Sequence, residues 1–287
     1  MTDSILETVS DRLRARDALR SVRCNRVTVG DSVVLVELSD SSESDDHPLA
    51  GLAHRPRNTE LDLDGTESSR SNRTVDELLE PIEADDRDCD ENVGSLERAV
   101  AVATVNALSV PFLEWRAGDP MALLDPSVET ITTVGLFRPA FRKFEDVDVR
   151  VIERTSVDDD LSTPDGVRVS AFEPADAPRA MAGSEVVFVT GSVFVYDGIT
   201  NYLETAPDAA TVVVVGATAS FLPGPLFASG VDVVAGATID EPGRVREAIS
   251  DGSCGTGLHD AGVRKVYTAT DRPSGIQLES VSTKDQP

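Results

Sequence analysis

The chain contains little cysteine. Cys24, Cys89 and Cys254 are the only three among 287 residues, and they lie far apart in the sequence. No CxxC motif and no Cys/His pair has the spacing of a metal finger. These absences argue against a disulfide-stapled scaffold and against a zinc ribbon.

Long apolar segments are also absent. A membrane-spanning helix needs roughly 20 consecutive apolar residues, and no stretch of this sequence approaches that length. The first residues, Met1 to Arg16, are charged and helix-like and contain no apolar signal region. We therefore expect a cytoplasmic protein that has no membrane partner.

Lysine is rare, and the overall charge is strongly acidic. The sequence has 51 acidic and 26 basic residues, a net charge of −25, and its only lysines are Lys143, Lys265 and Lys284. This argues against nucleic acid as a partner, because phosphate binding needs clustered Lys and Arg. High salt screens the repulsion among surface carboxylates, so the composition is typical of a halophilic protein in a salt-adapted cytoplasm.

Valine-rich runs are the most informative feature that is present. Three of them, 186–192, 212–218 and 231–238, are mostly apolar and end in glycine with a small or hydroxylic residue. Short runs without polar alternation are typical of parallel strands that helices cover on both faces. Open α/β sheets bind ligands at the carboxyl ends of their strands, where these glycines fall. The pattern therefore predicts both a fold class and the position of a site.

The first part of the chain has a different pattern. We predict helices and strands in mixed order: a helix over 4–19, strands over 22–29, 33–38 and 49–53, and helices over 74–80 and 94–108. Thr74 and Glu77 have the spacing of a capping box. The acidic segments 39–47 and 62–73 are expected to be solvated loops that serve solubility. This half is α+β.

Three prolines and a glycine between Pro111 and Pro126 mark a domain boundary. Beyond it, predicted strands alternate with crossover helices, as parallel strands require. The strands are 131–137, 147–152, the three valine runs and 263–268, and the helices are 175–181, 199–205, 225–229 and 242–250. We predict a Rossmann-like, doubly wound, mostly parallel sheet over 119–270, after a smaller α+β domain over 1–118 and before a polar tail over 271–287.

Two well-known motifs are missing from this second half. Its first predicted strand ends in Gly135-Leu136-Phe137 instead of G-x-G-x-x-G, which argues against a dinucleotide cofactor. Glu153 nevertheless follows the second strand, where an acid could hold a ribose. Ser192 is not part of a G-x-S-x-G motif, because Phe194 replaces the second glycine. A nucleophilic serine is therefore not indicated.

The glycine turns supply candidate binding residues. Thr190-Gly191-Ser192 could form a cradle for a phosphate or carboxylate group, or it could be a simple turn. Gly216-Ala217-Thr218 and Asp197-Gly198 are expected at the same edge of the sheet. Their convergence favours the cradle.

Histidines and one amide complete the candidates. We expect His47, in an acidic loop, to be only solvated, whereas His54 ends a short strand and could face an interdomain cleft. Cys254 and His259 could ligate a metal, but the glycines around them favour a mobile loop over a preformed cage. Asn106, in an otherwise apolar helix, either caps the helix or reaches the cleft.

Taken in order, these segments resemble a known family. The segments 189–192, 197–200 and 215–218, with Leu222-Pro223, Leu226-Phe227 and Gly230-Val231, resemble the DUF364 domain, which carries a heavy-metal chelation label. Gly51-Leu52-Ala53 and 104–109 resemble its usual amino-terminal partner, the DUF4213 domain with an enolase N-terminal-like fold. The family usually has Asn-Gly-Thr where this chain has Asp197-Gly198-Ile199-Thr200, and proline where it has Ala217. These departures weaken a transfer of roles to Asp197 and Ala217.

The resemblance implies a binding site between the two domains. We expect a small anionic molecule or a chelated heavy metal in a cleft lined by Asn106, Glu153, Thr190, Gly191, Ser192, Asp197, Thr200, Gly216 and Thr218. Backbone amides, hydroxyls and a carboxylate suit such a ligand better than a bare soft metal, which prefers thiolate or imidazole. Two alternatives stay open: an enzyme that uses Asp197 or Glu153 as general base, and a structural subunit with a vestigial cleft. Assembly into a homo-oligomer also stays open.

Overall fold

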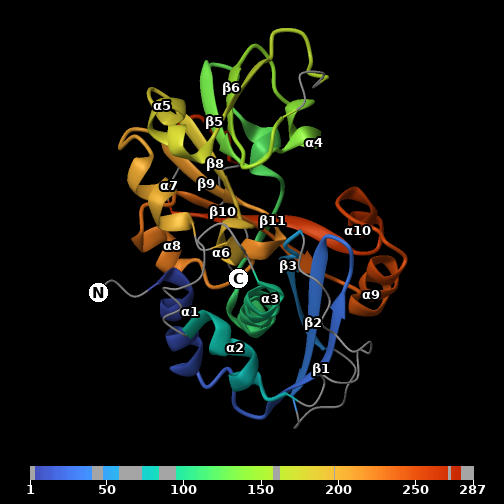
Figure 1. The fold of residues 1–287 in the computed structure, drawn as a ribbon. Coiled ribbons are helices and arrows are strands. Elements are labelled where there is room, and N and C mark those ends of the chain that lie inside the picture. The colour runs from blue at the N-terminus through green and yellow to red at the C-terminus, as the bar shows by residue number, and fades with distance from the viewer. Residues whose placement is uncertain are drawn as a thin grey trace, which may run out of the picture.

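The computed structural model describes residues 4–40, 48–57, 73–83, 95–157, 162–196, 198–270 and 273–278. They form two units, each built around its own sheet (Figure 1). None of the helices within these ranges combines the length and the apolar character that crossing a bilayer requires.

The amino-terminal unit packs an antiparallel sheet on helices. Its strands pair in the order β1 (Val22–Val29), β2 (Val33–Asp40), β3 (Leu49–His54), and its helices are α1 (Ile5–Arg14), α2 (Val75–Glu83) and α3 (Leu96–Ser109). The predicted capping box of α2 is present, since the Thr74 hydroxyl accepts from the Glu77 N–H and the Glu77 carboxylate accepts from the Thr74 N–H. α1 ends earlier than predicted, and Asp17 beyond it has a left-handed φ of 55°.

Helix α3 lies at the centre of the molecule. Every residue from Ala99 to Ser109 is buried, as expected for a helix that is apolar on all sides. It packs on β2 and β3 on one side and on α6 (Val193–Tyr196) of the second unit on another. Gly51 permits the close approach of β3, because a Cβ atom there would lie 2.1 Å from the Ala103 carbonyl oxygen.

The second unit is a mixed sheet of eight strands in the order β4-β11-β10-β9-β8-β5-β6-β7. From β7 to β10 all neighbours pair in parallel, whereas β11 is antiparallel to both β10 and β4. The bounds are β4 (Arg116–Ala117), β5 (Thr130–Val134), β6 (Asp148–Ile152), β7 (Arg168–Phe172), β8 (Val186–Thr190), β9 (Thr211–Val215), β10 (Val233–Ile239) and β11 (Val263–Ala269). The predicted fold class, a mostly parallel α/β sheet after a smaller α+β unit, is confirmed.

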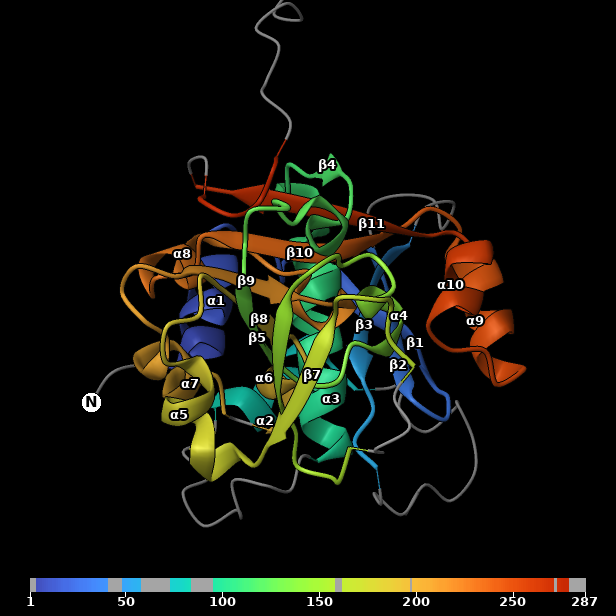
Figure 2. The same cartoon turned by 90° about the horizontal axis from the view of Figure 1, so that it is seen from above.

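Helices cover both sides of this sheet. Helices α5, α7 and α8 lie on one face, and α4 packs on the opposite face. Figures 1 and 2 show α9 and α10 beyond the carboxyl end of β10, beside β1 and β2. The α-helices are α4 (Arg138–Phe141), α5 (Ala177–Met181), α6, α7 (Ile199–Thr205), α8 (Gly224–Ala228), α9 (Pro242–Ser250) and α10 (Thr256–Asp260); four 3₁₀ turns are η1 (Val110–Phe112), η2 (Pro120–Leu123), η3 (Pro174–Asp176) and η4 (Ala217–Ala219). Helix α9 also packs against β1 and β2, so an apolar core joins the two units.

Two strands, β4 and β7, were not predicted from the sequence. They are the outermost strands of the sheet, and each pairs with only one neighbour. β7 is largely exposed and therefore lacks an apolar run. β4 is only two residues long and pairs with β11, although it precedes the predicted boundary at residue 118. The predicted strand 131–137 stops at Val134, because Gly135 turns the chain with a φ of 96°.

Candidate functional site

The candidate site lies at the point where the strand order reverses, between β5 and β8. The chain runs outward from β5 to β6 and β7 on one side, and from β8 to β9 and β10 on the other. In open α/β sheets ligands bind beyond the carboxyl ends of the strands at this reversal. Two cavities lie along that edge. Glu153, Thr190 and Ser192 line one of them, and Gly216, Thr218 and His259 line the other.

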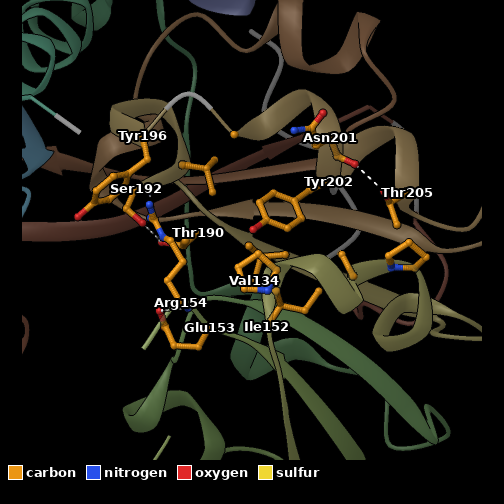
Figure 3. Close-up of a pocket in the computed structure, with 16 residues that line it drawn as sticks. Val134, Ile152, Glu153, Arg154, Thr190, Ser192, Tyr196, Asn201, Tyr202 and Thr205 are labelled. Carbon is orange, nitrogen blue, oxygen red and sulfur yellow. Dashed lines mark hydrogen bonds between the residues drawn. The ribbon is translucent and has the colours of Figure 1, made fainter. Parts of the chain in front are cut away.

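The first cavity, which we call the switch-point pocket, lies between the ends of β5 and β8 and has a volume of about 270 Å³. Figure 3 shows Thr190, Ser192, Glu153, Arg154 and Tyr196 together, with Tyr202, Asn201 and Thr205 across from them. All of its described lining residues belong to the second unit: Val134, Gly135, Ile152, Glu153, Arg154, Pro174, Ala177, Pro178, Thr190, Ser192, Val193, Tyr196, Gly198, Asn201, Tyr202 and Thr205.

Hydrogen bonds to the backbone hold Glu153 in place. Its Oε2 atom accepts from the Leu136 N–H at 3.0 Å, and its Oε1 atom accepts from the Arg154 N–H at 2.9 Å. Nearby, the hydroxyl oxygens of Thr190 and Ser192 lie 3.2 Å apart. The pocket therefore presents one anchored carboxylate and a pair of hydroxyl groups.

Aromatic side chains complete this pocket. The guanidinium of Arg154 lies over the ring of Tyr196, 3.6 Å from its centroid, which is a cation–π contact. Burial raises the pKa of Tyr202, so its hydroxyl stays protonated at neutral pH. Among the described lining residues, Arg154 is the one cationic side chain, and none carries a thiol or an imidazole.

The second cavity, the interdomain cleft, has a volume of about 380 Å³ and lies between the two units. The amino-terminal unit contributes Ser32, Val33 and Leu52–His54. The remaining lining residues surround the ends of β9 and β10 and the start of β11: Gly118, Asp119, Pro120, Met121, Phe137, Pro139, Ala140, Lys143, Val215, Gly216, Ala217, Thr218, Ala235, Gly236, Ala237, Gly255, Leu258, His259, Val263, Lys265 and Val266.

A cluster of three charges lies at one wall of the cleft. The Asp119 carboxylate accepts hydrogen bonds from Lys143 and from Lys265, the latter at 2.7 Å. Burial acts to raise the pKa of Asp119, but these two hydrogen bonds outweigh it and hold the pKa below its usual value. With Asp119 ionised, the cluster carries a net charge of about +1 at neutral pH.

His54, which lines the cleft, also contacts the wall of the switch-point pocket. Its Nε2 atom lies 3.3 Å from the Tyr196 hydroxyl oxygen, and its backbone N–H donates to the Thr218 hydroxyl at 2.9 Å. Burial lowers the pKa of His54 from 6.5 to about 4, and the charges of Arg57 and Arg154 act in the same direction. The imidazole is therefore neutral at neutral pH.

Asn106 joins the two units. Its Nδ2 group donates to the carbonyl oxygens of Leu52 at 2.7 Å, Thr218 at 3.1 Å and Ala217 at 3.2 Å. The side chain is buried and lines a separate, smaller cavity of about 170 Å³. Asn106 thus positions the glycine turn after β9, which is neither of the two roles weighed from the sequence.

The other predicted residues are dispersed. Gly191 is buried where two turns meet, because a Cβ atom there would lie 3.0 Å from the Ala219 nitrogen. Thr200 is exposed on α7 and does not line the switch-point pocket. Gly216, with a φ of 128°, and Thr218 line the cleft. Asp197, like His47 and Cys89, lies outside the described residues.

Cys254 and His259, the predicted metal ligands, do not form a metal site with other described residues. Cys254 is exposed, and the His259 Nδ1 atom lies 2.8 Å from the Val263 carbonyl oxygen. Within the part of the chain that the structure describes, no three His, Cys, Asp or Glu residues could together hold a metal ion. His259 does line the cleft, so its Nε2 atom is the part that could face a ligand.

Lys143 and Lys265 of the cleft, and Arg154, Tyr196 and Tyr202 of the pocket, were not among the residues predicted to form the site. The rarity of lysine was a signal: two of only three lysines in the chain line one cavity. For the tyrosines and Arg154 the sequence contained no comparable signal.

Comparison with known proteins gives a consistent result. A model of the DUF364 family, described as "Putative heavy-metal chelation", matches residues 120–268. A DUF364 protein of unknown function from Pyrococcus horikoshii superposes with a TM-score of 0.69 at 18% identity, covering 93% of this chain and 100% of that one. A second, from Desulfitobacterium hafniense, has a TM-score of 0.64 at 14% identity and covers 91% and 100%.

No curated protein matches the chain. The two structures support the fold over almost the whole length, and the family model spans more than half of the residues. The chain belongs to the DUF364 family.

Proposed function

We propose that the interdomain cleft binds a small, partly apolar organic anion, either free or as the chelator of a heavy metal. The observation that carries this proposal is the placement of lysine. In a chain with a net charge of −25, two of the three lysines line this one cavity. Because most of the lining side chains are apolar, an anion in the cleft is attracted more strongly than it would be in water.

The other walls of the cleft favour a ligand whose uncharged part is apolar. Val33 and Leu52 from the first unit face Met121, Phe137 and Leu258 from the second. Ligand pockets of this kind are mostly apolar, with a few polar groups that orient the ligand. An aromatic carboxylate meets both requirements, whereas a hydrated inorganic anion meets only one and a neutral sugar meets neither.

Imidazole groups support a metal chelate over a bare metal. Neutral histidine is a common metal ligand, and His54 and His259 could each fill an open position on a metal that a chelator already holds. A bare ion would need three or four protein ligands, and the described residues contain no such group.

Catalysis has less support than binding. Glu153, one of the two candidate general bases, lies in the switch-point pocket, and its carboxylate already accepts two backbone hydrogen bonds. The other candidate, Asp197, lies outside the described residues. We therefore favour a binding protein.

A thermal-unfolding screen in molar potassium chloride tests this function. The probes are pyridine-2,6-dicarboxylate and 2,3-dihydroxybenzoate, each alone and as its Co²⁺, Ni²⁺ or Zn²⁺ complex, with the free metal ions for comparison. A ligand present at a hundred times its dissociation constant stabilises the folded state by about 2.7 kcal/mol. We expect the anions or their complexes, and not the free ions, to raise the melting temperature.

Variants then locate the site. The double variant Lys143→Met, Lys265→Met should lose the ligand-induced shift. Arg264→Met is the matched control, because Arg264 is the neighbour of Lys265 on β11 and also forms an ion pair, with Asp240, but does not line the cleft. The proposal fails if no probe shifts the melting temperature, or if the double variant responds as the wild type does.

A further inference from the structure

The switch-point pocket is chemically unlike the cleft. Its polar groups are a carboxylate, a guanidinium, hydroxyls and an amide, set among aromatic rings. We propose that this pocket is a second binding site, for a phosphorylated ribose, free or within a nucleoside monophosphate. This proposal is independent of the function proposed for the cleft.

The position of Glu153 and its unused hydrogen-bond acceptor capacity support the binding of a ribose. Glu153 directly follows β6, the strand next to β5 in the sheet, and a carboxylate at this place in a doubly wound sheet can accept from ribose hydroxyls. An ionised carboxylate has about four acceptor positions. Two are used by backbone N–H groups, which leaves about two for the adjacent 2′ and 3′ hydroxyls of a ribose.

Arg154 supports the binding of the phosphate group. Its guanidinium is held against the Tyr196 ring and is the one cation among the described residues of the pocket. Arginine binds phosphate with several parallel hydrogen bonds. The Thr190 and Ser192 hydroxyls, which Figure 3 shows beside Arg154, can donate further hydrogen bonds to phosphate oxygens.

The same geometry argues against a dinucleotide as the ligand. A pyrophosphate would bind the free backbone N–H groups of a glycine-rich turn after β5. Here the Leu136 N–H in that turn already donates to Glu153. A volume of about 270 Å³ also suits a single sugar phosphate with its base directed outward.

Calorimetric titration of the full chain in molar potassium chloride tests the site, with ribose 5-phosphate, AMP and 2′-deoxy-AMP as probes. The first two distinguish a free sugar phosphate from a nucleotide. We expect at least one of them to bind, and AMP to bind about tenfold more tightly than 2′-deoxy-AMP if AMP is recognised, because the deoxy compound lacks a hydroxyl that a charged acceptor engages.

Two matched pairs of variants assign the roles. Glu153→Gln should remove the preference for AMP over its deoxy form. Glu185→Gln should keep this preference, because Glu185 also accepts backbone hydrogen bonds but lies at the amino ends of the strands, away from the pocket. Arg154→Met should weaken all phosphorylated probes about tenfold. Arg179→Met, which removes another surface guanidinium stacked on a ring, should have no effect.

The expected results in all four variants would establish the site. AMP should also still bind to the Lys143→Met, Lys265→Met protein, because these lysines line the cleft and not the switch-point pocket. The proposal is overturned if neither ribose 5-phosphate nor AMP binds the wild type. It is also overturned if AMP and 2′-deoxy-AMP bind equally, a comparison that needs no variant. Equal weakening by Arg154→Met and Arg179→Met would exclude a phosphate at this position.

Discussion

The two cavities occupy one edge of one sheet, yet their chemistry is opposite. The switch-point pocket is lined by hydroxyls, an anchored carboxylate and tyrosine rings, all from the second unit. The interdomain cleft is mainly apolar, with two lysines and two imidazoles, and the first unit supplies part of its wall. A valine-rich strand lies beneath each cavity, β8 beneath the pocket and β9 beneath the cleft, so the difference does not come from these strands.

What differs is the cover over the strand ends. The amino-terminal unit packs over the ends of β9 and β10, where β3 and Asn106 contact the η4 turn. It leaves the ends of β5 and β8 to the helices of their own unit. One sheet edge thus carries two cavities because the amino-terminal unit covers only part of it.

The largest expected effect comes from removing the close approach of β3 to α3. In Gly51→Ala the new Cβ atom would lie 2.1 Å from the Ala103 carbonyl oxygen and 2.5 Å from the Ala107 nitrogen, so backbone must move. We expect the free energy of unfolding to fall by about 3 kcal/mol, measured by urea denaturation. Gly243→Ala on α9, where only a flexible Arg246 side chain is near, should leave it almost unchanged.

Asn106→Ala should be next in size and should separate the two cavities. It removes the donor to three carbonyl groups that belong to β3 and η4. We expect a loss of about 2 kcal/mol in stability and weaker binding in the cleft, but unchanged AMP binding in the switch-point pocket. Thr104→Val is the control, because the Thr104 hydroxyl bonds only within its own helix. Equal losses of both ligands would show that the cavities are not independent.

Acid should lower the free energy of unfolding through His54, which lies between the two cavities. Its pKa in the folded protein, about 4, lies below the unfolded value of 6.5, so the unfolded state binds more protons between these values. The stability linked to His54 is therefore complete above about pH 6.5 and is lost as the pH falls toward 4.

We expect this loss to amount to about 2 kcal/mol. Urea unfolding near neutral pH and at about pH 4.5 would measure it as the difference between the wild type and His54→Gln, in which the titration of carboxylates cancels. His259→Gln serves as the control variant. A pH dependence that is the same in His54→Gln and the wild type would contradict the burial of this imidazole.

The smallest effect is expected at Cys254, which belongs to neither cavity. Its side chain is exposed, and Cys254→Ser should change the free energy of unfolding by less than about 0.5 kcal/mol. It should also leave the response to metal chelates unchanged in the thermal screen. A lost response would restore Cys254 as a metal ligand and would extend the cleft to the loop before α10.

Most of the fold followed from local pattern. Valine runs without polar alternation identified the buried parallel strands, and the capping box at Thr74 identified the start of α2. β7 could not be found in this way, because an exposed edge strand has no apolar run. The antiparallel direction of β11 was equally invisible, since a strand's direction depends on its partner and not on its own residues.

The site was predictable only in part. Glycine at the strand ends indicated the edge of the sheet at which both cavities lie, and Thr190, Ser192, Glu153, Gly216 and Thr218 all line a cavity there. The division into two cavities was not predictable. It depends on contacts such as His54 with Tyr196 and Asn106 with Thr218, which join residues that are 142 and 112 positions apart.

By itself, the sequence determined the parallel sheet, its glycine-ended strands and a strongly acidic surface, because these depend on residue type and on spacing within a few positions. Tertiary structure alone decided which strand ends share a cavity, which charges lie in it and how much of it is apolar. These properties depend on the packing of one unit against the other, through α3, β3 and α9. No local pattern records that packing, since the residues that meet there belong to segments that are far apart along the chain.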